Sequence, residues 1–172
     1  MSRGRVPPPP DGPDAATYGV LAHQPEMLRA FRRLYGTLWS HGVLDPPTKE
    51  VARIRNARTI DCCYCRNVRF AAARQQGLEE ELVDLVNEGW EDSALRERHK
   101  LAIRWTDAFL GDPHGIDAGF RARMLGEFTP AELVELTAGL ALFHGFAKIA
   151  VALGQQPEAM PVTVLATPDR PA

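Results

Sequence analysis

The stretch Asp45-Pro46-Pro47-Thr48-Lys49-Glu50 opens a segment that continues to Asp61-Cys62-Cys63-Tyr64-Cys65. An aspartate before two prolines is a helix start signal, because proline is tolerated in the first turn and the carboxylate can cap free amide groups. The spacing predicts one helix from this signal to about Ile60. It predicts another from about Cys62 to Gln76, with Asp61 as its cap.

Helical spacing continues on both sides of this stretch. Further helices are predicted over about 25–40, 79–87, 93–110 and 117–127, and a last one to about 153 opens with the capping box Thr129-Pro130-Ala131-Glu132. Two-residue alternation occurs only in the short piece Pro161–Leu165, which could dock on a neighbour as a strand. The predicted fold class is therefore all-α, with six or seven helices.

The fourteen prolines are concentrated at the two ends of the chain. Proline-rich segments with few apolar residues cannot be helical and are typical of extended tails. The sequence thus predicts an extended proline-rich tail over residues 1–14, one folded domain over 15–154, and a second extended tail over 155–172.

Composition excludes several classes of protein. The 172 residues are 45% hydrophobic, and 20 Lys and Arg against 22 Asp and Glu leave a net charge of −2. This balance argues against a nucleic-acid partner and against a polybasic membrane-surface protein. The N-terminus has no apolar core of a secretory signal, and the apolar stretch 137–154 contains His144 and Lys148, which makes it a poor membrane span. We expect a soluble, cytoplasmic protein.

Two cysteines at Cys-x-x-Cys spacing are the sharpest chemical signal. On a helix, the sulfurs of Cys62 and Cys65 lie on one face and can approach to disulfide distance. The first turn of a helix also favours a thiolate over a thiol, while Cys63 points elsewhere and is a bystander. Two alternatives stay open: small apolar fillers of a core, or half of a zinc site. The second needs two more ligands, and the histidines are isolated: His99, His114 and His144.

Two charged residues are further candidates for the site. Glu50 lies inside the apolar stripe of its helix, where it is either a general base with a raised pKa or neutralised by an arginine; the candidates are Arg53, Arg58 and Arg69. Arg69 follows Cys65 by four residues, so on a continuous helix its charge could stabilise a thiolate or Glu50. A surface arginine is the alternative. His144 is interpreted as a hydrogen-bonded core histidine rather than a ligand.

Taken together, Glu50, the run Cys62-Cys63-Tyr64-Cys65, Ala71–Arg74 and Gly77-Leu78 resemble the carboxymuconolactone decarboxylase-like superfamily, and more narrowly its alkylhydroperoxidase D branch. The segments Gly42–Pro46 and Phe143–Lys148 are similar to family segments as well. The resemblance covers about residues 20–155. It implies an all-α fold, assembly as trimers or hexamers, and thiol-dependent peroxidase activity.

Residue by residue, the resemblance implies that Cys65 is the peroxidatic thiol, Cys62 the resolving thiol and Glu50 the base of a proton relay. The chain departs from the family motif at two relay positions, where Arg69 and Tyr64 stand in place of histidine. The resemblance therefore implies a dithiol with a weakened relay.

The function that follows is a hydroperoxidase or disulfide reductase that uses the dithiol, a small-molecule hydroperoxide and a thiol reductant of unknown identity. The resemblance implies no metal, flavin or nucleotide cofactor, and the chain has no glycine-rich loop of the kind that holds a nucleotide phosphate. Two alternatives remain: a carboxymuconolactone decarboxylase-like lyase on the same scaffold, and a non-catalytic helical oligomer or redox sensor.

Overall fold

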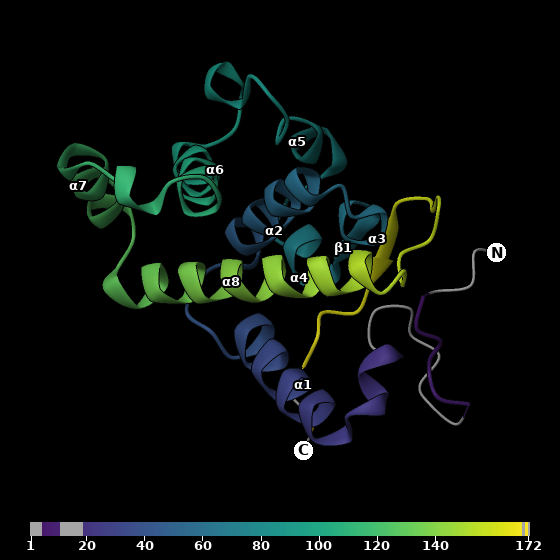
Figure 1. The fold of residues 1–172 in the computed structure, drawn as a ribbon. Coiled ribbons are helices and arrows are strands. Elements are labelled where there is room, and N and C mark those ends of the chain that lie inside the picture. Colours follow the sequence, from purple (N-terminus) through teal and green to yellow (C-terminus); the bar gives the residue numbers. More distant parts are fainter. Residues whose placement is uncertain (1–4, 11–18, 170, 172) are drawn as a thin grey trace.

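The computed structural model describes residues 5–10, 19–169 and 171 (Figure 1). It contains eight α-helices and one pair of strands in those residues: α1 (Pro25–Ser40), α2 (Pro46–Ile60), α3 (Cys63–Asn67), β1 (Val68–Phe70), α4 (Ala71–Gln75), α5 (Glu80–Asp84), α6 (Glu97–Leu110), α7 (Ala118–Glu127), α8 (Pro130–Ala152) and β2 (Thr163–Leu165). The all-α prediction is confirmed. The helix count exceeds six or seven because the segment 62–76 forms two short helices separated by β1.

Helix α2 is the centre of the fold, with α8 crossing it on one side and α6 packed on another (Figure 1). Four of its apolar side chains are 0% exposed: Val51, Ala52, Ile54 and Ala57. Ala52 belongs to a core cluster shared with α6, α7 and α8, whereas Val51 and Ile54 belong to another under α4, α5 and α6. A helix covered on several faces holds its polar residues rigidly, which suits a site built on α2.

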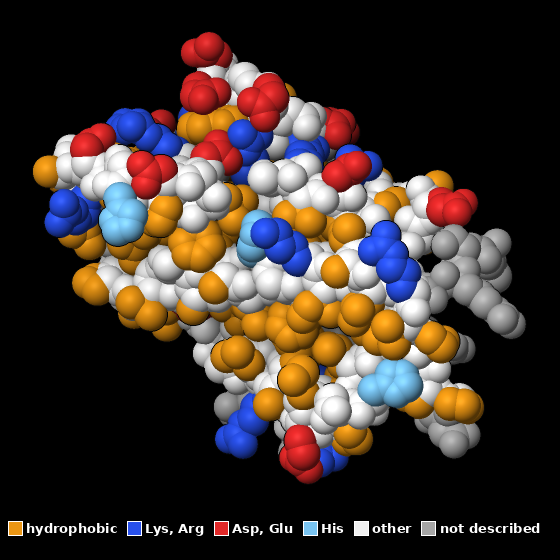
Figure 2. All heavy atoms as spheres, viewed as in Figure 1, with side chains coloured by type: hydrophobic (Ala, Val, Ile, Leu, Met, Phe, Trp, Pro, Cys, Tyr) orange, Lys and Arg blue, Asp and Glu red, His pale blue; other side chains and the backbone are white. Residues whose placement is uncertain are grey.

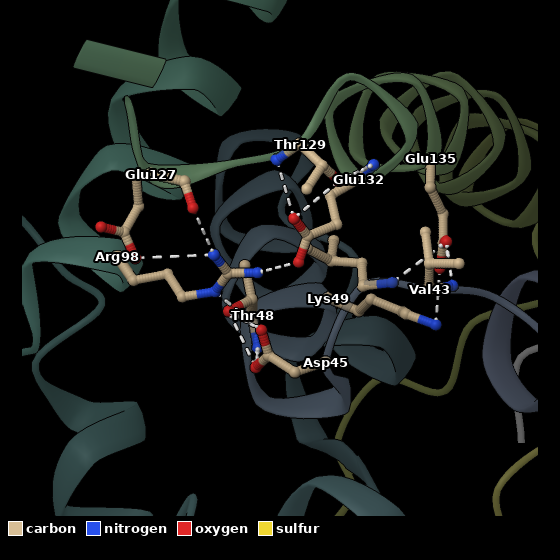
Figure 3. Close-up of polar contacts among 10 residues, drawn as sticks. Val43, Asp45, Thr48, Lys49, Arg98, Glu127, Thr129, Glu132 and Glu135 are labelled. Carbon is tan, nitrogen blue, oxygen red and sulfur yellow. Dashed lines mark hydrogen bonds and ion pairs between the residues drawn. The ribbon is translucent and has the colours of Figure 1, made fainter. Parts of the chain in front are cut away.

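A polar network fixes the start of α2 against three other helices (Figure 3). Asp45 accepts a hydrogen bond from the amide of Thr48 at 3.0 Å, as its predicted role as a helix cap requires. It also accepts a hydrogen bond from the guanidinium of Arg98 at 2.9 Å. Arg98 also reaches Glu132, the residue that completes the predicted capping box of α8. The buried Lys49 ammonium pairs with Glu135 of α8 at 2.7 Å. These bonds hold the N-terminus of α2 in one orientation relative to α6 and α8.

Helix α8 is the longest element and runs across the whole molecule. Among the described residues it is the one helix that is long and apolar enough to cross a membrane by length and composition, and a third of that window is buried in the fold. A core helix of a folded domain passes the same test. Apolar side chains gather over α8 and toward α1 (Figure 2).

The chain reverses direction after α2, so the predicted helix from Cys62 to Gln76 is wrong as one piece. Asp61 has a φ of 56° and ends α2 with a left-handed turn rather than capping the next helix. Cys62 takes the cap position of α3 instead. Val68–Phe70 then forms β1, which pairs in parallel with β2 from the C-terminal segment. The strand-like piece predicted at Pro161–Leu165 is thus docked on the dithiol region.

Candidate active site

The two sulfurs of Cys62 and Cys65 lie 3.0 Å apart, and neither is in a disulfide. Cys62 is 0% exposed and its Sγ accepts the backbone amide of Cys65 at 3.4 Å, because it stands at the cap of α3. Cys65 is partly exposed, whereas the sulfur of Cys63 contacts Asn67 and not the other two sulfurs. The predicted approach of the Cys62 and Cys65 sulfurs is therefore found in the structure.

The environment makes the two thiols unequal. The hydrogen bond from Cys65 lowers the pKa of Cys62 to about 7, and the backbone amides of Cys65 and Tyr64 act in the same direction. The same hydrogen bond between the two sulfurs, together with burial, raises the pKa of Cys65. A substantial fraction of the buried Cys62 is thus a thiolate near neutral pH, and in that form Cys65 carries the shared proton.

Arg53 is the cation beside the dithiol. Its Nη1 donates to the carbonyl oxygen of Cys65 and its Nη2 to that of Val68, both at 2.6 Å. The charge of the guanidinium contributes to the lowered pKa of Cys62 and opposes the rise in the pKa of Cys65. Sequence reasoning named this residue only as a possible partner of Glu50, and the signal for it was its position three residues after that carboxylate.

Glu50 holds Arg53 in place. Its carboxylate is 0% exposed and accepts Nε and Nη2 of Arg53 at 2.7 and 2.9 Å, and the backbone amide of Phe70 at 3.1 Å. Of the two roles left open for Glu50, the ion pair is the one present in the structure. Its role as a general base stays a prediction, and no contact with a sulfur exists within the described part of the chain.

The expected position of Arg69 on the dithiol face is wrong. Because Val68–Phe70 is a strand, the four-residue helical spacing from Cys65 does not apply. The Arg69 guanidinium pairs with Glu80 of α5 at 2.5 Å and donates to the carbonyls of Arg66 and Val68. Arg69 is therefore a buried structural residue whose ion pair links β1 to α5.

Cys65 opens into an apolar cavity of about 400 Å³. The wall is formed by α1, α2, α3, β1, α8 and the C-terminal segment. Six aromatic side chains line it: Phe31, Tyr35, Tyr64, Phe70, Phe143 and Phe146. Its polar lining comes from Arg32, Arg53, Asn56 and Asp169, together with the Cys65 thiol. A small organic molecule fits such a volume and lining.

The C-terminal segment is one wall of this cavity. Leu165 and Pro168 line it, and the segment is held by the β1–β2 pairing and by three hydrogen bonds. The amide of Ala72 donates to the Thr167 hydroxyl, Ser40 donates to the Pro168 carbonyl, and His41 bonds Asp169 at 2.6 Å. The segment predicted as a tail therefore contributes to the site, although the boundary at residue 155 stays a prediction.

The hydrogen bond between Asn56 and His144 was not predicted from the sequence. Asn56 is 1% exposed, lines the cavity and accepts a hydrogen bond from Nδ1 of His144 at 3.0 Å. The predicted hydrogen bond of His144 is confirmed, but the residue is partly exposed and is not part of the core. Burial, and then the charge of Lys148, lower the pKa of His144, so the imidazole is neutral near pH 7. The described residues contain no cluster of three or more side chains that could hold a metal ion.

Three comparisons relate this chain to known proteins. A model of the carboxymuconolactone decarboxylase family matches residues 25–122. Uncharacterized proteins from two strains of Mycobacterium tuberculosis, Rv2313c and MT2376, are each 32% identical over 112 residues, which is 64% of this chain. The chain spans about two fifths of the length of these curated relatives, because the match covers 39% of each.

Similar folds occur in solved structures. An uncharacterized peroxidase-related protein from Silicibacter sp. TM1040 has a TM-score of 0.70 at 18% identity, over 83% of this chain and 75% of its own. The alkylhydroperoxidase AhpD core of an uncharacterized peroxidase-related protein from Ralstonia eutropha JMP134 has a TM-score of 0.69 at 20% identity, over 83% and 76%. At these identities the likeness shows the fold.

Proposed function

This chain belongs to the carboxymuconolactone decarboxylase family, and we propose that it is a thiol-dependent peroxidase that reduces organic hydroperoxides through Cys62 and Cys65. The observation that carries the proposal is the 3.0 Å contact between a buried sulfur and a sulfur at the wall of an apolar cavity. A dithiol at this distance can close to a disulfide with little movement of the backbone.

The contact between the two sulfurs supplies the path for the first step. The Cys62 thiolate takes the proton of Cys65 across the 3.0 Å contact, so that the sulfur at the cavity becomes the nucleophile. Cys65 then attacks the terminal oxygen of the hydroperoxide. A sulfur–oxygen bond forms, the oxygen–oxygen bond breaks, and the sulfur is oxidised to a sulfenic acid by two electrons.

The remaining steps return the protons and close the disulfide. The alkoxide that leaves takes the proton now held by Cys62 and departs as an alcohol. The Cys62 thiolate attacks the Cys65 sulfenic sulfur, forms the disulfide and releases hydroxide, which takes a proton from solvent in place of the one that Cys62 lost when it ionised and becomes water. The sum is two thiols and one hydroperoxide converted to a disulfide, an alcohol and water. An external thiol reductant then restores both thiols.

The cavity supports an organic substrate rather than hydrogen peroxide alone. Its volume of about 400 Å³ and its six aromatic side chains provide an apolar surface that a small polar peroxide does not use. We therefore assign the substrate class as hydroperoxides with an aromatic or branched apolar body.

Steady-state consumption of cumene hydroperoxide with dithiothreitol as reductant tests the function. Cys62→Ser and Cys65→Ser should each lower turnover by about a hundredfold or more, because either change removes a step of the cycle. Cys63→Ser is the matched control and should retain turnover, since its sulfur contacts neither partner. An unreactive wild-type protein, or equal activity in all four proteins, contradicts the proposal.

Assembly of this chain with further copies of itself is also proposed, with the trimer or hexamer taken from the resemblance. The supporting feature is an open apolar groove on α7 and α8. Its lining includes Leu125 and Val134, which are 53% and 70% exposed. Exposed apolar side chains around a groove are typical of contacts between subunits.

A further inference from the structure

The buried amide of Asn56 has an unused donor at the cavity that holds Cys65. The residue is 1% exposed and lines the cavity wall. Its Oδ1 accepts from His144, and no residue described in the structure accepts a hydrogen bond from its Nδ2. Because Asn56 lines the cavity, this donor is free to bond water or a ligand there.

Arg53 and the Cys65 thiol, which also line the cavity, are already engaged. Nε and Nη2 of Arg53 bond Glu50, and Nη1 bonds the carbonyl of Cys65. The Cys65 thiol is shared with Cys62. A substrate oxygen near Cys65 therefore finds its available amide donor in Asn56.

His144 fixes the orientation of that amide. In its Nδ1–H tautomer, His144 donates to Oδ1 across the contact between α8 and α2, and an exchange of Nδ2 with Oδ1 would lose this bond unless the tautomer changed as well. The imidazole carries no charge near neutral pH, because burial and Lys148 lower its pKa. The pair therefore presents a neutral donor of fixed direction.

We propose that Asn56 is a catalytic residue of the cavity, held in position by His144, and that its Nδ2–H group hydrogen-bonds the oxygen that leaves when Cys65 attacks an organic hydroperoxide. This rests on the proposed peroxidase function. As the oxygen–oxygen bond breaks, negative charge develops on the leaving oxygen, and a fixed amide donor stabilises that charge more than it stabilises the neutral peroxide. The proton that completes the alcohol still comes from Cys62.

A comparison of two reactions of the same sulfur tests the proposal. Oxidation by cumene hydroperoxide generates an alkoxide, whereas alkylation by iodoacetamide releases iodide, which needs no amide donor. Both rates are measured under single-turnover conditions on the reduced wild-type protein, Asn56→Leu and Asn56→Ala. Leucine is close to asparagine in shape, so it removes the donor with little change in volume. Asn87→Ala is the matched control, because Asn87 is exposed and bonds the carbonyl of Asp84 far from the cavity.

The expected result is a fall in the peroxide rate by at least about tenfold in both Asn56 variants, with an unchanged alkylation rate. His144→Leu should reproduce part of the fall in the peroxide rate. His144→Gln, which retains an N–H donor, should have a peroxide rate close to that of the wild type. Equal peroxide rates in wild type and Asn56 variants overturn the role of Asn56 alone. A parallel fall in both reactions also overturns it, because the residue then acts on the thiol or on folding. A wild-type protein that alkylates but does not react with peroxide overturns the peroxidase function and this inference with it.

Discussion

Nη1 of Arg53 donates a hydrogen bond of 2.6 Å to the carbonyl oxygen of Cys65, which places a buried guanidinium directly behind the dithiol. The sequence pattern had assigned this electrostatic role to Arg69, which instead pairs with Glu80. The guanidinium groups of Arg53 and Arg69 are thus both buried and both paired with a glutamate. Arg53 bonds the carbonyl of Cys65 itself, whereas Arg69 bonds the carbonyl of Arg66.

The two ion pairs can be compared by neutralising each. The double variant Glu50→Gln/Arg53→Gln should raise the pKa of Cys62, because the cation that favours its thiolate is gone. The matched double variant Arg69→Gln/Glu80→Gln should leave that pKa unchanged. The pH dependence of iodoacetamide alkylation measures both. Equal shifts in the two double variants would contradict the assignment to Arg53.

The pKa of Cys62 also predicts a pH-dependent stability of the reduced protein. The value is about 7 in the fold against an ordinary 9.0, so the thiolate stabilises the folded state above the folded pKa, and this contribution is lost as the pH falls through about 7. The free energy of unfolding should gain about 2 kcal/mol between about pH 6 and pH 8.5 relative to Cys62→Ser. Urea unfolding of both proteins at the two pH values provides the measurement. Parallel curves would show that the Cys62 pKa is not lowered by folding.

Removal of the C-terminal segment should change substrate preference. A chain that ends at Met160 lacks β2 and the wall formed by Leu165 and Pro168, so the cavity opens to solvent. We expect kcat/KM for cumene hydroperoxide to fall by about tenfold, with a much smaller effect on hydrogen peroxide, because the lost contacts are apolar. Steady-state kinetics with both peroxides measure the ratio. A ratio that does not change would mean that the segment does not bind substrate.

The apolar groove on α7 and α8 predicts where copies of this chain contact one another. Val134→Asp should shift the protein toward a 19.0 kDa monomer in light scattering, because it places a charge in the groove. Met27→Asp is the matched control, since Met27 is an exposed apolar residue of α1 outside the groove. A wild-type monomer at micromolar concentration, or dissociation by both variants alike, contradicts an interface at this groove.

Local signals in the sequence predicted most of the fold. Helices α1, α2 and α8 begin where a proline or a cap predicts, as at Asp45 and Thr129, because capping depends on a few neighbouring residues. The break at Val68–Phe70 was not predicted, since its cause is a partner strand from the far end of the chain. Helical periodicity within a short window cannot report such a pairing.

The site divides in the same way. The contact of Cys62 with Cys65 follows from their spacing and was predicted. The cavity was not predicted, because its aromatic side chains come from four separate elements and the C-terminal segment completes its wall. The place of Asn56 was not predicted either: it is buried, and His144 of α8 bonds it. Only the tertiary crossing of α2 and α8 brings these two residues together.

Treatment of the reduced protein with one equivalent of cumene hydroperoxide, followed by intact mass measurement and peptide mapping, tests the central claim most directly. The account predicts the loss of two hydrogen atoms per chain, a single Cys62–Cys65 link, a free Cys63 thiol and one equivalent of the corresponding alcohol. A link that contains Cys63, a link between chains, or three thiols left unchanged by the peroxide would contradict it.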